Sequence, residues 1–185
     1  MRHKVYTREQ ILRAAFNLAA DSGFDHFTAR NIAKKMGGST QPIYFHFESM
    51  KDLKVALIKW IQEDMIQKMN EIPESEDLLL DVCTTYIDFA RLYPKVFNAL
   101  YFDNSGSGKM LYRRSLEEFK HIITSHKKMQ SLTERQISRM HDGIWMAVTG
   151  IAQLRKAGII EPTREQQAVI IDEVIESVLK DEKNK

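Results

Sequence analysis

The stretch GGSTQPIYFHF, residues 37 to 47, fits either a buried strand or a short helix with rings on more than one face. Five consecutive large or apolar residues, 43 to 47, are compatible with a strand. Two preceding glycines supply a sharp turn, however, and Ser39 belongs to the residue types that cap helix N-termini. Pro42 is tolerated near a helix start, where backbone N–H groups lack intrahelical partners. With Ser39 as the cap and Pro42 at the third helical position, we expect a short helix.

The spacing divides this helix into two faces. Ile43 and Phe47 are four residues apart and belong to the inner face, so Thr40, Gln41 and Tyr44 project outward from the first turns. Glutamine can pair with adenine, threonine can touch a thymine methyl group, and a tyrosine hydroxyl suits a phosphate. The alternative is that every ring belongs to the core and the segment is only a structural cap.

A second short helix precedes this one. Thr28 is its expected cap and Gly37 its end, and an earlier helix runs from Thr7 to Gly23. Two short helices joined by a glycine turn are typical of a helix-turn-helix. Residues 1 to 48 carry a net charge of +3 and the rest of the chain −1, which favours an anionic partner for this part.

Three motifs follow one another here: Phe27-Thr28-Ala29-Arg30-Asn31-Ile32-Ala33, then Gly37-x-Ser39-x-x-x-Ile43-Tyr44-x-His46-Phe47, then Lys51-Asp52-Leu53. Together with the helix that starts near Thr7, they resemble the TetR family of bacterial transcriptional regulators. The resemblance implies a helix-turn-helix DNA-binding domain over 4–64 and a ligand-binding and dimerisation domain over 65–185. The second part matches only in its helical architecture.

The resemblance also implies which side chains contact DNA. These are Thr28, Ser39, Thr40, Gln41, Pro42, Tyr44, His46 and Lys51. It places residues 40–42 at the bases, and Tyr44, His46 and Lys51 at the sugar-phosphate backbone. Because proline has no N–H to donate, base readout is expected to depend on Thr40 and Gln41. Gly38 departs from the family, which usually has a buried Val or Ile at this position. The smaller residue predicts either a small hole in the core of this domain or closer packing around it.

The remaining chain also has a helical apolar period. Further helices are expected over 50–70 (capped by Ser49), 75–92, 94–102, 109–128, 133–157 and 163–180. The fold class is therefore all-α, with about nine helices. Pro73 is expected to break the fourth helix, and residues 104–108 to form a flexible flap. Only 8 glycines and 4 prolines disfavour a turn-rich all-β fold.

Many large flexible or aromatic side chains occur between the fourth and eighth helices. The resemblance implies an effector pocket there, for which the candidates are Trp60, Met65, Met69, Tyr86, Phe89, Phe97, Tyr101, Tyr112, Phe119 and Trp145. Such side chains suit varied apolar ligands. The alternative for each of them is ordinary core packing.

The last two helices carry more apolar surface than one neighbour can cover. A homodimer through a four-helix bundle accounts for this surface, and the interface candidates are Ala147, Gly150, Ile151, Leu154, Ile171, Val174, Ile175 and Val178. The alternative is that both helices are internal to one chain.

Other classes of protein have little support. The start has no signal-peptide core, no run is long enough to span a membrane, and Cys83 is the single cysteine, so a cytoplasmic protein is expected. The histidines have no metal-ligand spacing, and no catalytic or cofactor motif is present. We therefore expect a ligand-responsive DNA-binding repressor, dimeric on a pseudo-palindromic operator and released by a small apolar effector. The alternative is a DNA-binding adaptor or architectural protein without an effector.

Overall fold

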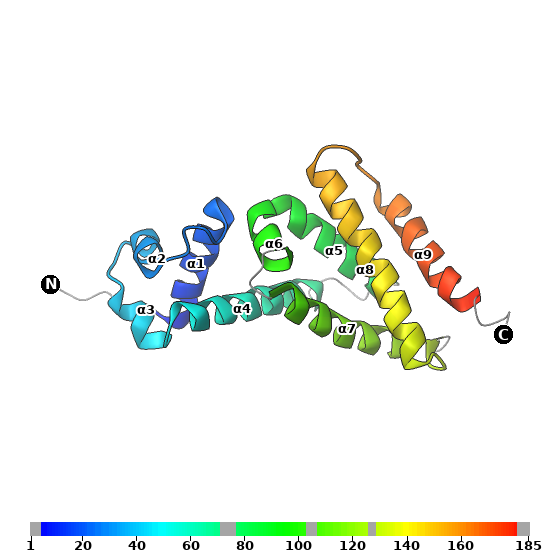
Figure 1. The fold of residues 1–185 in the computed structure, drawn as a ribbon, viewed down its shortest axis with the longest axis horizontal. Helices are drawn as coiled ribbons and strands as arrows, with labels where there is room; N and C mark the ends of the chain where they lie inside the picture. Colours follow the sequence, from blue (N-terminus) through cyan, green and yellow to red (C-terminus); the bar gives the residue numbers. More distant parts are fainter. Residues whose placement is uncertain (1–4, 71–76, 103–106, 126–128, 181–185) are drawn as a thin grey trace. The chain divides into compact units, whose positions relative to one another are not determined.

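A computed structural model of the chain describes residues 5–70, 77–102, 107–125 and 129–180. Within these ranges the regular structure is entirely helical, which confirms the predicted all-α class (Figure 1). The helices are α1 (Arg8–Ser22), α2 (Ala29–Met36), α3 (Gln41–His46), α4 (Met50–Asn70), α5 (Leu78–Leu92), α6 (Pro94–Tyr101), α7 (Ser107–Ser125), α8 (Glu134–Lys156) and α9 (Arg164–Lys180).

The chain forms two compact units. The first comprises Met1–Glu71 with Tyr93–Ser107, and the second Ile72–Leu92 with Gly108–Lys185. The α6 helix thus belongs to the same unit as α1 to α4. The domain boundary at residues 64 and 65 stays a prediction.

Local capping sets the helix starts, as predicted for Thr7, Thr28 and Ser49. Thr7 and Thr133 each form a reciprocal capping box, and the hydroxyl of Thr28 accepts the N–H of Asn31 at 3.2 Å. The Ser49 hydroxyl accepts a first-turn N–H of α4 at 3.1 Å. Each of these caps satisfies a backbone donor that has no partner within its helix.

The predicted start of α3 was wrong by one residue. The carbonyl of Thr40 accepts from Ile43 N at 3.0 Å and from Tyr44 N at 3.3 Å, so it is the first carbonyl of the helix. Thr40 is therefore the cap, without a side-chain hydrogen bond of its own, and Pro42 occupies the second helical position. Ser39 precedes the helix.

Two residues of the predicted flexible stretch, Ser107 and Gly108, belong instead to α7, which begins at Ser107. A glycine in the first turn of a helix, such as Gly108, disturbs little of the hydrogen-bonded ladder. Residues 103–106, the break at Pro73, a start at Ser75 and a helix end at 126–128 lie outside the described residues.

The first unit is held together by fully buried apolar side chains. Ile11, Leu53 and Phe97, from α1, α4 and α6, are each 0% exposed. The ring of Phe16 on α1 meets the ring of Trp60 at 5.9 Å and that of Tyr93 at 5.0 Å, both edge-on.

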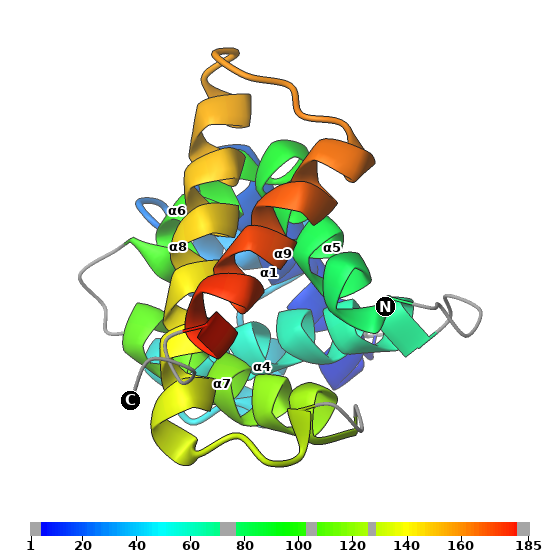
Figure 2. The same ribbon diagram turned by 90° about the vertical axis from the view of Figure 1, so that its right-hand side faces the viewer.

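In the second unit, α5, α8 and α9 pack against one another, with α8 and α9 antiparallel and side by side (Figures 1 and 2). Gly143 permits the close approach, because a Cβ added there would lie 2.7 Å from Cγ1 of Val174. At Gly150, one of the predicted interface positions, an added Cβ meets no atom within 4 Å.

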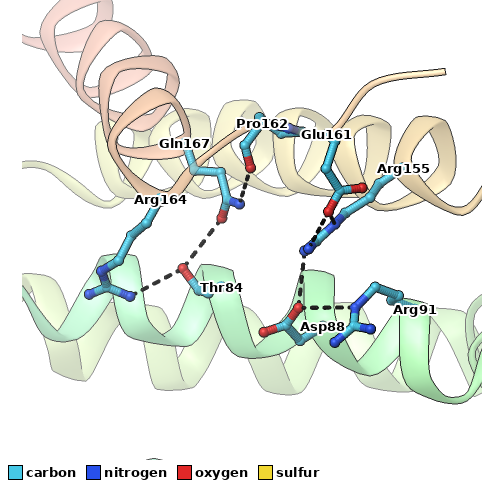
Figure 3. Close-up of polar contacts among 8 residues, drawn as sticks. All are labelled: Thr84, Asp88, Arg91, Arg155, Glu161, Pro162, Arg164 and Gln167. Carbon is cyan, nitrogen blue, oxygen red and sulfur yellow. Dashed lines mark hydrogen bonds and ion pairs between the residues drawn. The ribbon is translucent and has the colours of Figure 1, made fainter. Parts of the chain in front are cut away.

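Polar contacts hold the α8–α9 connection over α5 (Figure 3). The guanidinium of Arg155 contacts Asp88 at 3.0 Å and Glu161 at 2.6 Å. Arg164, at the start of α9, contacts the Asp81 carboxylate at 2.5 Å and the Thr84 hydroxyl at 3.4 Å. The side chain of Asp81 is only 7% exposed, so Arg164 compensates a buried charge.

Replacing Arg164 by methionine is expected to lower the free energy of unfolding by about 1–2 kcal/mol, because the buried carboxylate of Asp81 loses its ion pair with Arg164. Arg164 is itself half-exposed, so water replaces part of its effect. Chemical denaturation measures the change, with Arg135→Met at an exposed α8 position as the control. Adding Asp81→Leu to Arg164→Met should restore stability, and equal losses in variant and control would refute the pair's role.

Candidate nucleic-acid interface

The turn between α2 and α3 is closed by main-chain hydrogen bonds. Gly37 has φ 68°, in the left-handed region that favours glycine. Its N–H donates to Lys34 O at 3.1 Å, and the N–H of Gly38 donates to Ala33 O at 3.0 Å. These bonds end α2 and reverse the chain into α3 within four residues.

Gly38, the position that departs from the family pattern, is closely packed and leaves no hole. A Cβ added there would lie 2.8 Å from Cε2 of Tyr6, whose hydroxyl donates to Met36 O at 2.6 Å. Tyr6 is 7% exposed and therefore fills the space of the usual larger residue. Sequence reasoning missed it, although a large residue directly before the cap Thr7 fits a hydrophobic staple with Ile11.

The two faces of α3 are those that the spacing predicts. Ile43 is 1% and Phe47 3% exposed, so both belong to the core. Gln41 and Tyr44 are exposed, and Thr40 is half-buried. The outward side chains thus include two hydrogen-bonding groups of the kinds that read bases or bind phosphate.

Phe45 is an exposed ring that sequence reasoning left without a role. Its side chain is 83% exposed, directly beside the exposed Tyr44. An apolar group on this face can contact a thymine methyl or a deoxyribose. Phe45 comes two residues after Ile43, which lies on the inner face. This spacing places Phe45 on the opposite face of the helix and could have identified it from sequence.

Three of the predicted DNA contacts flank α3. The hydroxyl of Thr28 accepts from Asn31 N, so its proton remains available for a phosphate oxygen. Lys51 is exposed in the first turn of α4, and Ser39 is exposed in the turn before α3. Each of these side chains can meet an anion from solvent.

His46 is engaged within the protein. Its Nε2 lies 3.0 Å from the main-chain oxygen of Tyr6, and a carbonyl only accepts, so Nε2 is the donor. With Nε2 committed to Tyr6 O, only Nδ1 remains for a contact with DNA. The geometry ties His46 to the segment that packs on Gly38, and its DNA contact stays a prediction.

Basic side chains lie on the same unit as α3. Arg30 and Lys34 of α2 are exposed, and Lys35 pairs with Asp21 of α1. The guanidinium of Arg8 lies over the ring of Phe47, 5.1 Å from its centroid. This charge supports the predicted preference for an anionic partner.

The candidate pocket residues belong to both units. Trp60, Phe97 and Tyr101 lie in the first, and Tyr86, Phe89, Tyr112, Phe119 and Trp145 in the second. The side chains of Met65 and Met69 lie outside the described part. In the second unit, the Trp145 ring lies 5.9 Å from that of Tyr86 and 5.5 Å from that of Tyr112.

The predicted interface residues differ in how far their own chain buries them. Ile151, Ile171 and Val178 are buried, Leu154 is exposed, and Ala147, Gly150, Val174 and Ile175 are half-buried. Met146, which was not predicted, is 69% exposed. Met146, Gly150 and Leu154 are spaced by four residues and therefore share one face of α8.

Within the described ranges, no group of three His, Cys, Asp or Glu side chains could hold a metal ion. None of the described helices is long and apolar enough to cross a membrane. Burial, with a smaller effect of Asp77, raises the pKa of Cys83 to about 12. Because thiol oxidation proceeds through the thiolate, Cys83 is an unreactive core residue.

Comparison with known proteins agrees with this geometry. Residues 11–57 match the family model described as bacterial regulatory proteins, tetR family. A nucleoid occlusion factor SlmA from Vibrio cholerae is 31% identical over 144 residues, covering 72% of this chain and 70% of that protein. An HTH-type transcriptional regulator from Haemophilus influenzae is 25% identical over 125 residues. The match spans 65% of this chain and 61% of the length of that regulator.

Solved structures share the fold over nearly the whole chain. A transcriptional regulator from Rhodococcus sp. Rha1 has a TM-score of 0.67 at 18% identity, covering 95% of this chain and 97% of that one. The fatty acid degradation regulator FadR from Bacillus halodurans has a TM-score of 0.66 at 15% identity, covering 93% and 97%. The chain therefore belongs to the TetR family of bacterial regulatory proteins and is a DNA-binding transcriptional regulator.

Proposed function

We propose that the protein is a repressor that binds a pseudo-palindromic operator as a homodimer and is released by a small apolar effector. The observation that carries the DNA part is the division of α3, with Ile43 and Phe47 buried and Gln41 and Tyr44 exposed after a tight turn. A recognition helix needs one face for the protein core and another for the major groove.

The proposed contacts are of two kinds: some side chains contact bases (the readers), and others contact phosphates (the holders). Thr40 and Gln41 read bases from the first turn of α3, with Pro42 against the groove floor. The DNA phosphates on either side of these bases are contacted by Tyr44, Thr28 and Lys51. Ser39, in the turn before α3, lies near the same phosphates. His46 acts mainly by fixing the segment around Tyr6, to whose oxygen it donates.

The readers and holders are expected to differ in sequence dependence. Gln41→Ala should weaken binding by about 1–3 kcal/mol at one base pair per half-site and relax specificity there. Lys51→Ala should weaken binding to every sequence alike and reduce the salt slope by about one unit. Fluorescence anisotropy with single-base operator variants at several salt concentrations measures both effects.

Lys59→Ala, at an exposed position further along α4, is the matched control for Lys51 and should leave the salt slope unchanged. A uniform loss of affinity for all sequences in Gln41→Ala would show that Gln41 holds the backbone instead of reading a base.

A homodimer is supported by the exposed apolar face of α8. Met146 is 69% and Leu154 41% exposed, and Gly150 lies between them with open space beside it. A second copy of this face could approach closely at the glycine and cover both side chains. Two helix-turn-helix domains (called heads below) related by a two-fold axis would then read inverted half-sites.

Release by an effector follows from linkage. We propose that α4 carries the coupling, because its start, capped by Ser49, adjoins α3, and its later part carries the pocket candidates Trp60, Met65 and Met69. A ligand that favours another tilt of α4 must bind less tightly to the DNA-bound form. A coupling of about 1–3 kcal/mol lowers operator affinity roughly 5- to 150-fold.

The names of the SlmA relatives, nucleoid occlusion factors, favour a second candidate. A DNA-binding adaptor or architectural protein would bind operator-like sites with no small-molecule control. Titrating operator affinity against compounds that raise the melting temperature separates the two functions. Stabilising compounds that never change operator affinity would favour the adaptor and refute the effector-controlled repressor.

A further inference from the structure

A buried histidine of the second unit, His141 on α8, lies among aromatic rings that the DNA interface does not use. Its side chain is 4% exposed. The rings of Tyr112 and Phe119, both on α7, lie 5.1 Å and 5.5 Å from the imidazole, and Trp145, one turn along α8, lies 5.5 Å away. Aromatic rings pack well against apolar groups, and their faces attract a cation.

The surrounding hydrogen bonds fix the position of the proton on His141. The hydroxyl of Ser115 donates to Tyr112 O at 2.9 Å, so its only proton is already used. At 2.9 Å from His141 Nε2, Ser115 Oγ must therefore accept, and Nε2 carries the proton. Burial lowers the pKa of His141 below its usual 6.5, against an opposing effect of Asp142, so the ring is neutral at pH 7.

The other ring nitrogen of His141, Nδ1, carries a lone pair and lies near the carboxylate of Asp142. Nδ1 of His141 is buried and makes no hydrogen bond among the described residues, and it lies 3.5 Å from Oδ1 of Asp142. The hydroxyl of Tyr112 donates to the same oxygen at 2.5 Å. This hydrogen bond is the main cause that raises the pKa of Tyr112, so the phenol keeps its proton.

We propose that these residues, the His141 cluster (Tyr112, Phe119, His141, Asp142 and Trp145), bind the head group of the effector, and that this head group is a primary ammonium. The inference rests on the proposed function, since it assigns the chemistry of the effector postulated there. An ammonium has three N–H donors and can serve Nδ1 and Oδ1 together. An anionic head group would face a carboxylate and a lone pair.

The ammonium takes the place that the Tyr112 hydroxyl now occupies at Asp142. The Asp142 side chain is 45% exposed, so an amine can reach it from solvent and displace the hydroxyl. The exchange replaces a neutral donor by a charged one, which forms the stronger hydrogen bond with a carboxylate. The apolar body of the ligand then packs on Phe119 and Trp145.

Three probes with one tail test the head group: 4-phenylbutylamine, 4-phenylbutyrate and trimethyl(4-phenylbutyl)ammonium. In a Trp60→Phe background, Trp145 is the single tryptophan and its fluorescence reports binding. The amine should bind saturably, the carboxylate at least tenfold more weakly, and the trimethylammonium between them, because it has charge but no N–H. Equal or tighter binding of the carboxylate, or equal binding of the trimethylammonium, would overturn the assignment.

Two substitutions should shift amine affinity in opposite directions. Asp142→Asn should weaken it at least tenfold, whereas Tyr112→Phe should strengthen it roughly two- to tenfold by removing the competing hydroxyl. Asp172→Asn, an exposed α9 carboxylate, is the matched control and should change nothing. A merely structural cluster would weaken binding in both variants, and that result would refute the proposal.

The same titrations with operator DNA present separate this inference from the proposed function. Amine binding with the predicted variant pattern but unchanged operator affinity would leave the head-group site intact and refute effector control. Failure of the amine to bind would refute the head-group site alone, because the DNA contacts do not depend on it.

Discussion

The combined substitutions Met146→Glu and Leu154→Glu are expected to make the protein monomeric and to lower operator affinity about 10²- to 10⁴-fold. The charges would lie on the apolar face of α8, where a second copy would bury them without a partner. A monomer binds one half-site and loses the effective concentration that links two heads. Both side chains are exposed in the single chain, so the fold should persist.

Sedimentation velocity and operator titration measure the two effects, and circular dichroism checks the fold. Met110→Glu is the matched control, because Met110 is an exposed methionine on another helix, α7. A doubly substituted protein that stays dimeric with unchanged operator affinity would place the interface elsewhere.

Gly38→Val is expected to lower the free energy of unfolding by about 2–4 kcal/mol, because it combines overpacking with the loss of a partly buried hydrogen bond. The added side chain would collide with the ring of Tyr6, 2.8 Å from the position of a Cβ, and displace its hydroxyl from Met36 O. Because His46 donates to Tyr6 O, DNA affinity should fall as well.

Chemical denaturation and DNA titration check the Gly38 prediction, with Ser39→Val at the exposed neighbour as the control for stability alone, because Ser39 is itself a proposed DNA contact. The double variant Gly38→Val with Tyr6→Leu should lose less stability than the sum of the two single variants, because the shorter side chain leaves room for the valine. Strict additivity would show that the two positions do not compete for the same space.

Much of the fold could be predicted because its signals are local. The caps at Thr7, Thr28 and Ser49 each depend on a hydrogen bond three residues along the chain, and apolar spacing marks the buried face of each helix. The error at Ser39 has the same origin. Two adjacent residues could both cap α3, and only the backbone conformation selects Thr40.

Contacts between residues far apart in the chain could not be predicted from the sequence, because they depend on which segments pack together. Tyr6 and Gly38 are far apart in the chain, and their contact arises only when the N-terminal segment crosses the turn between α2 and α3. Gly143 and Val174 likewise meet only because α8 and α9 pack closely.

The environment of His141 also required the structure. From sequence it had only its neighbour Asp142, and Ser115 and Tyr112 on α7 approach it through packing. By contrast, the predicted DNA-contacting side chains lie close together in sequence, in or near α2, α3 and the start of α4. Motif spacing alone could therefore nominate them.

Selection of bound DNA from a random pool shows whether the protein reads a specific sequence as a dimer. Two heads on a two-fold axis should enrich one motif with two inverted half-sites, their centres about one helical turn or slightly more apart, roughly 10 base pairs or above. Gln41→Ala should relax one position in each half-site and leave the spacing unchanged. Enrichment of no sequence, or of a single half-site without an inverted copy, would contradict a dimeric, sequence-reading regulator.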